Sequence, residues 1–273
     1  MVNKKLNIHH LSTKLAIINL IVIALCIIYS SILDYLPYFS DNTIYQGAFA
    51  TFWFDGLGYF TNQTNLLILV VTILYLTAYK TKLFDNGQLV FLSAVYITLT
   101  ALLCWAVLVP ITIAYSTAII NISMSINIAT MHLVTPTLFI VFAFFQYRHQ
   151  SLYGVKAKFK YKKQLLIGVI YPVVYVVYLI TINFISLPIS MFRDGCFPPQ
   201  GYVSIYAVAT NFNPQCFVPS FKNGSTIPTY TDYSGSLVFL VVPFLFIAFS
   251  IGIICLYVYV TNRIFYPKQI KNV

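Results

Sequence analysis

A run of five polar residues at 61–65, Thr-Asn-Gln-Thr-Asn, interrupts a long apolar stretch of the chain. A helix completes a turn in about 3.6 residues, so five successive residues face every side of it. Unpaired amide and hydroxyl groups are costly in hydrocarbon. We therefore expect this turn to be enclosed by other helices or to line a wet cavity, with Thr61 and Asn65 on one face.

A single histidine, His132, lies inside another apolar stretch, and Pro136 follows it four residues later. Proline has no N–H to donate to the carbonyl four residues earlier, which here belongs to His132. The spacing predicts a helix kink beside the imidazole and a free carbonyl acceptor.

These residue types suggest nucleophilic catalysis. A threonine hydroxyl such as that of Thr61 becomes a nucleophile when a neighbouring base takes its proton, and the neutral imidazole of His132 can do so. The amides of Asn65, Asn62 or Gln63 could then donate to a developing oxyanion. Neither Asp nor Glu occurs in either stretch, so a triad of the Ser-His-Asp type is excluded. We expect neither a metal nor a cofactor, because one histidine offers no ligand set.

Two other interpretations of these residues remain open. Intramembrane histidine and asparagine side chains often do no more than hydrogen-bond between helices. Polar side chains at membrane depth can also form an ion or ligand site.

Composition indicates the elements that must position these residues. Of the 273 residues, 59% are hydrophobic and only 8% are charged, which places the chain among membrane proteins. A bilayer crossing takes about 20 helical residues, so the length accommodates about six crossings. We predict an all-α integral membrane protein with one polytopic domain over 1–273 and spans near 15–36, 58–79, 88–115, 125–147, 164–185 and 236–262.

The distribution of Lys and Arg predicts the orientation of these spans. Basic residues precede the first span and follow the second, fourth and last spans, whereas only Arg193 and Lys222 fall on the other side. Basic residues near helix ends are retained in the cytoplasm. We therefore expect cytoplasmic termini, and we expect Thr61, Asn65 and His132 about 5 to 10 Å below the outer interface.

One long outer loop is predicted at 186–235, between the fifth and sixth spans. It holds Cys196 and Cys216, the two cysteines outside the spans, and an oxidising exterior favours a disulfide between them. Two free thiols are the alternative.

The net charge of +10 raises the question of a polyanionic partner. The basic residues are scattered along short connections, which argues against nucleic-acid binding. We expect anionic lipid headgroups to bind the basic stretch between the fourth and fifth spans, at Lys156, Lys158, Lys160, Lys162 and Lys163. The abundance of Lys, Ile, Asn and Tyr is typical of an AT-rich genome and suggests a bacterial cell membrane.

Several short motifs resemble the androgen-induced-gene-1-like family of membrane proteins. They are Tyr-Phe-Thr at 59–61 followed by Gln-Thr-Asn-Leu at 63–66, Met-His at 131–132 with Pro136, and Tyr-Pro at 171–172 with Tyr175 and Tyr178. The resemblance implies a six-helix membrane fold and, as in the animal members, threonine-dependent hydrolysis of fatty acid esters of hydroxy fatty acids. By motif, the catalytic residues fall on Thr61 and His132.

The first functional hypothesis is therefore a membrane-embedded lipid ester hydrolase that acts on fatty-acyl esters. The alternative is a non-catalytic lipid-binding, transport or envelope-complex protein in which the same polar residues hold a headgroup, a proton or a neighbouring helix.

Overall fold

The computed structural model describes residues 2–40, 59–78, 87–108, 126, 128–152, 159–186 and 234–266. Every regular element among them is helical, and six helices are long and apolar enough to cross a membrane. The prediction of an all-α, multi-pass membrane protein is confirmed. The outer loop with Cys196 and Cys216, and the basic residues Lys156 and Lys158, lie outside the described residues.

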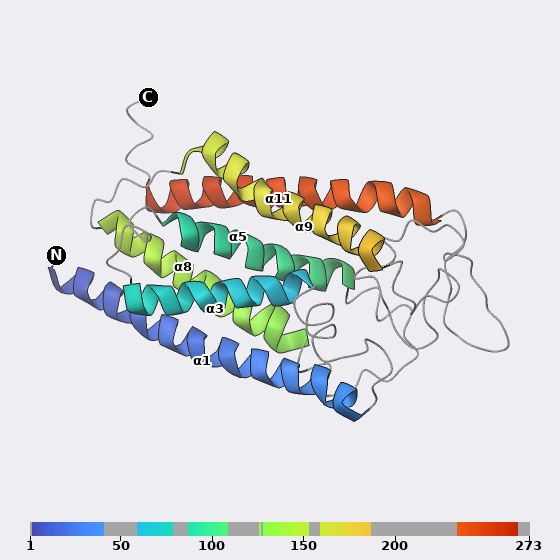
Figure 1. The fold of residues 1–273 in the computed structure, drawn as a ribbon. Coiled ribbons are helices and arrows are strands. Elements are labelled where there is room, and N and C mark those ends of the chain that lie inside the picture. The colour runs from blue at the N-terminus through green and yellow to red at the C-terminus, as the bar shows by residue number, and fades with distance from the viewer. Residues whose placement is uncertain are drawn as a thin grey trace.

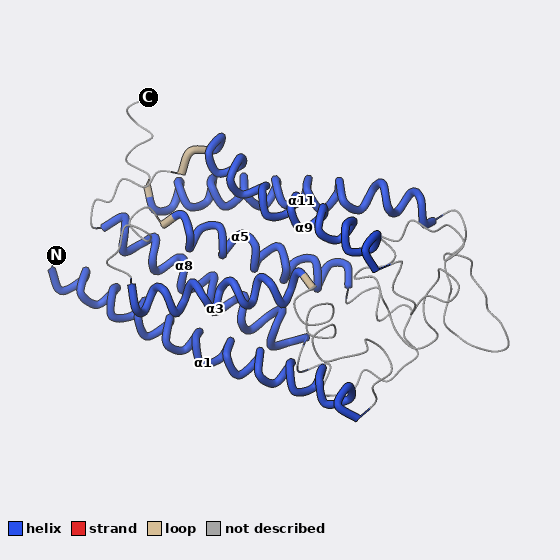
Figure 2. The backbone as a smooth tube through the Cα atoms, viewed as in Figure 1, coloured by secondary structure: helices blue, strands red, loops and turns tan. Residues whose placement is uncertain are grey.

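The helices follow the predicted windows closely. They are α1 (Val2–Ser40), α3 (Phe60–Ala78), α5 (Gln88–Leu103), the π-helical turn η2 (Cys104–Leu108), the π-helical turn η3 (Thr130–Val134), α8 (Thr135–Leu152), α9 (Tyr161–Ser186) and α11 (Ser234–Phe265). Figure 2 shows the described chain as helix with short loop pieces. The largest difference is in α1, which begins well before the predicted span because its leading polar residues continue the helix.

The long helices alternate in direction, so one end of the bundle collects the start of α1 and the end of α11 (Figure 1). We call this the basic end, because the described cationic residues beside helix ends gather there: Arg148, Lys160, Lys162, Lys163 and Arg263. The starts of α3 and α8 lie at the opposite end (Figure 1). The polar turn of α3 and His132 therefore belong to the same end of the bundle.

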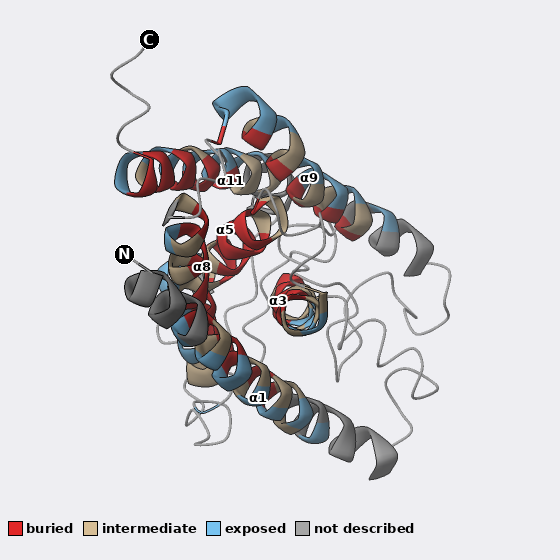
Figure 3. Cartoon of the chain, turned by 90° about the vertical axis from the view of Figure 1, so that its left-hand side faces the viewer, coloured by how far each residue is buried: buried red, intermediate tan, exposed pale blue. Residues whose placement is uncertain are grey.

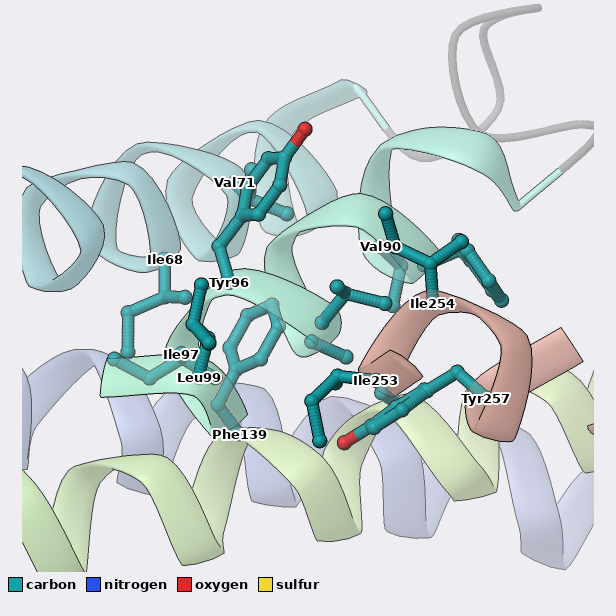
Figure 4. Packing of buried hydrophobic residues seen from close by; sticks show 14 of the residues in the cluster. Ile68, Val71, Val90, Tyr96, Ile97, Leu99, Phe139, Ile253, Ile254 and Tyr257 are labelled. Atoms are coloured by element: carbon teal, nitrogen blue, oxygen red, sulfur yellow. The ribbon is translucent and has the colours of Figure 1, made fainter. Parts of the chain in front are cut away.

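Helix α5 forms the centre of the bundle and contacts α3, α8 and α11. In its span 56% of the residues are buried, against 28% in the span of α1, whose outer side faces away from the bundle (Figure 3). Apolar side chains of α3, α5, α8 and α11 meet at this centre, among them Ile68, Ile97, Phe139 and Ile254 (Figure 4). Ile21, Leu25 and Ile28 of α1 are more than half exposed, as expected of side chains that contact lipid.

Polar side chains pair across helix boundaries inside this apolar core. Gln88 and Gln164 exchange two amide hydrogen bonds of 2.6 and 2.8 Å between α5 and α9. Ser12 pairs with Tyr75 at 2.9 Å and thereby joins α1 to α3. Because lipid offers no alternative partner, each such pair stabilises helix contact by about 0.6 kcal/mol.

Helix α9 approaches its neighbours at Gly168. A Cβ atom at this position would lie 2.8 Å from Cδ1 of Ile254 and 3.5 Å from Cδ2 of Leu92. The hydroxyl of Tyr96 donates to the Gly168 carbonyl at 3.1 Å. The missing side chain thus lets α9 pack against α11 and α5 at one point.

Gly168→Val should destabilise the bundle by about 1–3 kcal/mol, because the added methyl groups overpack a filled contact. Gly252→Val on α11 is the matched control, since a Cβ there meets no atom within 4 Å. The unfolding temperature of both variants in detergent micelles checks this. A loss of similar size in both would mean that the close contact at Gly168 is unimportant.

Candidate functional site

The polar turn at the start of α3 is enclosed by protein. Thr64 and Asn65 are fully buried, and Thr61, Asn62 and Gln63 are half-buried. The expected enclosure is therefore observed for Thr64 and Asn65, whereas the other three residues of the turn stay partly exposed.

Asn65 joins α3 to the η3–α8 segment through its side-chain amide. Its Nδ2 donates to the carbonyl of Thr61 at 2.9 Å and to the carbonyl of Met131 at 3.3 Å. Its Oδ1 accepts from the hydroxyl of Thr135 at 2.8 Å. Both amide N–H groups are thus used within the protein, and Asn65 acts as a cross-link between two helices in this state.

A pair of threonine hydroxyls joins α3 to α5. Oγ1 of Thr64 and Oγ1 of Thr100 lie 2.7 Å apart. Oγ1 of Thr64 also lies 3.0 Å from the Thr61 carbonyl, and Oγ1 of Thr100 lies 3.1 Å from the Tyr96 carbonyl. Two hydroxyl protons can make only two of these three bonds at once. The pair therefore has alternative donor arrangements at a fixed geometry.

His132 lies in the π-helical turn η3, immediately before α8. The N–H of Thr135 donates to the carbonyl of Thr130, five residues earlier, as the wider turn requires. The His132 carbonyl, which Pro136 cannot serve, accepts a hydrogen bond of 3.1 Å from Nε1 of Trp105 in η2. The sequence-based expectation of a free acceptor was therefore wrong, because an indole from another helix occupies it, and the backbone adjusts by a π-helical turn.

The imidazole of His132 is buried, with only 9% of the residue exposed. The ring lies near the backbone of Thr100 on α5. Its Nδ1 is fully buried and makes no hydrogen bond with any residue that the structure describes. A buried, unpartnered ring nitrogen is costly, so this atom needs an explanation.

Thr61 contributes to the same cluster through its backbone. Its carbonyl accepts from Thr64 and Asn65, while its hydroxyl makes no hydrogen bond within the described part of the chain. Asn65 is the link between Thr61 and the backbone beside His132. The direct approach of the Thr61 hydroxyl to the imidazole stays a prediction.

Gln63 faces a different neighbour. Its Oε1 accepts a 2.8 Å hydrogen bond from the hydroxyl of Tyr171 on α9. The Phe60 ring stacks on Tyr171 at 5.4 Å and meets the rings of Tyr175 and Phe246 edge-on at 5.0 and 5.3 Å. Aromatic side chains thus close the boundary between α3, α9 and α11 beside the polar turn.

Sequence reasoning did not assign a role to Thr64, Thr100, Thr135 or Trp105. Each sits in an apolar stretch, where its type alone does not reveal which neighbour it meets. Among the described residues no group of three or more metal-ligating side chains occurs, and Cys26, Cys104 and Cys255 are free thiols.

The fold and the site define a multi-pass α-helical membrane protein with a buried polar cluster at one end of the bundle. The chain belongs to the family described as Protein of unknown function (DUF1600), which matches residues 122–271. That match includes His132 but not the polar turn of α3.

A relative from Mycoplasma genitalium, the uncharacterized protein MG452, is 32% identical over 128 residues. The alignment covers 46% of this chain and 46% of the relative, so it spans about half the length of each protein. No solved structure matches the chain.

Asn65→Leu should lower the free energy of unfolding by about 1–3 kcal/mol, because it leaves the buried Thr135 hydroxyl and the Met131 carbonyl without this partner. Thr77→Val is the control, since its exposed hydroxyl bonds only to the Ile73 carbonyl of its own helix. The free energies of unfolding of both variants, measured by denaturation in detergent, check this prediction. Equal stability of the two variants would show that the Asn65 cross-link contributes nothing.

Proposed function

We propose that this protein is a membrane-embedded hydrolase of fatty-acyl esters, with Thr61 as nucleophile and His132 as general base. The observation that carries the proposal is the buried, unpartnered Nδ1 of His132 within the polar cluster that also contains the start of α3. The resemblance to the androgen-induced-gene-1-like family supports the same two residues.

The Thr100 backbone could orient the imidazole as a general base in the absence of a carboxylate. In this proposal the proton sits on Nε2, near the Thr100 backbone, and Nδ1, which has no partner among the described residues, keeps its lone pair as an acceptor. That tautomer is the one that a general base requires. A neutral carbonyl thus takes the orienting role that Asp has in a triad of the Ser-His-Asp type.

The hydrogen bonds of the polar turn indicate which amide could donate to an oxyanion. Both N–H groups of Asn65 are occupied by carbonyls, which makes Asn65 a positioning residue in this proposal. The donor role then falls to Asn62 or to Gln63, whose amide is oriented by the Tyr171 hydroxyl. Such donors stabilise charge that develops only in the transition state.

An acyl chain would enter from the bilayer at the boundary between α3 and α9. There the two helices meet through the Phe60, Tyr171 and Tyr175 rings, side chains that can change rotamer without breaking helix backbone. The ester would reach the polar turn, and the Thr61 hydroxyl and Nδ1 of His132 must approach to about 2.6–3.2 Å for proton transfer. The π-helical turn around His132 gives this segment an adjustable geometry, and such turns are frequent at functional sites.

A fluorophosphonate probe tests the proposal on purified protein in micelles. We expect covalent labelling of the natural chain, loss of labelling in Thr61→Ala and in His132→Ala, and retention in Thr61→Ser. Thr77→Ala is the control for a threonine change on the same helix. Labelling that persists in both the Thr61→Ala and His132→Ala variants would overturn the catalytic assignment.

A non-catalytic role is the second candidate, and one observation favours it. The side chain of Asn65 has every hydrogen bond satisfied by the protein itself, as in a structural cross-link. In this role the chain binds or moves a lipid, or serves as a subunit of an envelope complex. Absence of site-specific labelling, together with recovery of bound lipid in unhydrolysed form, would support this candidate over the first.

We also propose that the basic end of the bundle faces the cytoplasm of a bacterial cell, with both termini there. The gathering of Arg148, Arg263 and the start of α9 at one end supports this orientation. Lys160, Lys162 and Lys163 are exposed at that start, which supports the proposal that this basic stretch of the sequence binds anionic lipid headgroups.

Reporter fusions in bacteria test the orientation. Green fluorescent protein fused after Val273 should fluoresce, and alkaline phosphatase at the same point should be inactive, because the fluorescent protein matures in the cytoplasm and the phosphatase outside it. Alkaline phosphatase inserted near residue 210 should be active. The reverse pattern would contradict the proposed orientation.

A further inference from the structure

Two successive backbone carbonyls in η3, those of Met131 and His132, accept hydrogen bonds from side chains of other elements. Nδ2 of Asn65 on α3 donates to the Met131 carbonyl at 3.3 Å. Nε1 of Trp105 in η2 donates to the His132 carbonyl at 3.1 Å. The peptide groups on either side of the His132 Cα atom are therefore each held from a different part of the bundle.

The local sequence explains why these two carbonyls lack their usual partners. In an α-helix the Met131 carbonyl would accept from the N–H of Thr135, and the His132 carbonyl from the N–H four residues later. The Thr135 N–H instead donates to the Thr130 carbonyl, five residues earlier. Residue 136 is a proline and has no N–H to donate. Both carbonyls thus need side-chain donors.

The segment formed by α5 and η2 meets His132 at two points. Trp105 binds the His132 carbonyl, and the backbone of Thr100, five residues before Trp105, lies near the imidazole. Trp105 belongs to the same membrane-crossing stretch as α5 and is 42% exposed, so the hydrogen bond lies at the edge of the bundle. Hydrocarbon offers no donor that could replace the indole, and an unpaired carbonyl there is costly.

The indole of Trp105 is suited to this contact, because its N–H donates one hydrogen bond and accepts none. The bond to the His132 carbonyl therefore has only one possible direction. The hydroxyl pair of Thr64 and Thr100 differs in this respect, since either oxygen can be its donor.

We propose that Trp105 is a positioning residue for His132: its indole supplies the donor that Pro136 lacks and thereby fixes the turn that carries the imidazole. Without the indole N–H, Asn65 still holds the preceding peptide group, so the turn stays attached on one side and the imidazole changes its direction. For its effect on catalysis this inference rests on the proposed hydrolase function, but the direction of the imidazole can be measured without any reaction.

Nitrogen-15 NMR of the histidine side chains, in the full chain in lipid nanodiscs, tests the proposal. The His132 signals are assigned by comparison with His132→Gln. We expect two well-separated ring-nitrogen signals in the natural chain, from one fixed tautomer. Trp105→Phe keeps an aromatic ring but removes the N–H, so the two signals should move toward each other as the imidazole samples both tautomers. Unchanged signals in Trp105→Phe, or averaged signals already in the natural chain, would overturn the proposal.

Tyr96→Phe is the matched control on the same membrane-crossing stretch. It also removes one side-chain donor to a backbone carbonyl, that of Gly168 on α9. The His132 signals should stay unchanged in this variant. A change as large as that in Trp105→Phe would show that the loss of any such donor disturbs the imidazole, and the specific role of Trp105 would be refuted.

Pro136→Ala provides a rescue, because it restores a backbone N–H four residues after His132. In the double variant with Trp105→Phe, this N–H can donate to the His132 carbonyl in place of the indole. We expect the two separate ring-nitrogen signals to return. Signals that stay averaged in the double variant would mean that the missing donor is not the cause, and the proposal would fail.

Labelling by the fluorophosphonate probe separates this proposal from the proposed function. If the natural chain is labelled, Trp105→Phe should be labelled several-fold more slowly, and the double variant with Pro136→Ala at close to the natural rate. Equal rates for Trp105→Phe and the natural chain would refute the positioning role and leave the hydrolase proposal intact. If the natural chain is not labelled, the hydrolase proposal fails, and the NMR signals alone decide the role of Trp105.

Discussion

The structure depends on one constraint: a polar group inside the hydrocarbon region must find its partner within the protein. Asn65 meets this constraint most completely, because its single amide bonds to α3, to η3 and to the first residue of α8. The position of the polar turn and the position of His132 are therefore coupled. Any change in how α3 packs against α8 must break or exchange these bonds, which is why this contact holds the candidate site together.

The same constraint bears on the π-helical turn η3 at His132. Pro136 removes a backbone donor from the start of α8, and the orphaned carbonyl of His132 is served by the indole of Trp105 from η2. The chain thus departs from α-helical geometry in η2 and η3, the two turns that this hydrogen bond joins. The wider turn η3 and the unpartnered Nδ1 of the buried imidazole therefore occur at one place. Because π-helical turns are frequent at functional sites, this place is the candidate site of the bundle.

Buried polar atoms without a hydrogen-bond partner occur on α1, η3, α8 and α11 of the described bundle. At one end the Nδ1 of His132 lies beside satisfied amides and hydroxyls, and toward the other end the Tyr147 hydroxyl belongs to a ring packed against Phe159 and Phe265. Between them α5 presents mostly apolar side chains to its neighbours (Figure 4).

Hydropathy along the chain was enough to predict the six spans, because the cost of unsatisfied backbone in lipid permits only helices there. The enclosure of residues 61–65 followed from the same cost applied to side chains. The pairing of Thr64 with Thr100 and of Trp105 with the His132 carbonyl was beyond sequence reasoning. Those contacts depend on how each helix is rotated about its axis and on which neighbour it meets. Rotation is decided by the packing of whole helix faces, such as the close approach at Gly168, and no local pattern of residue types records it.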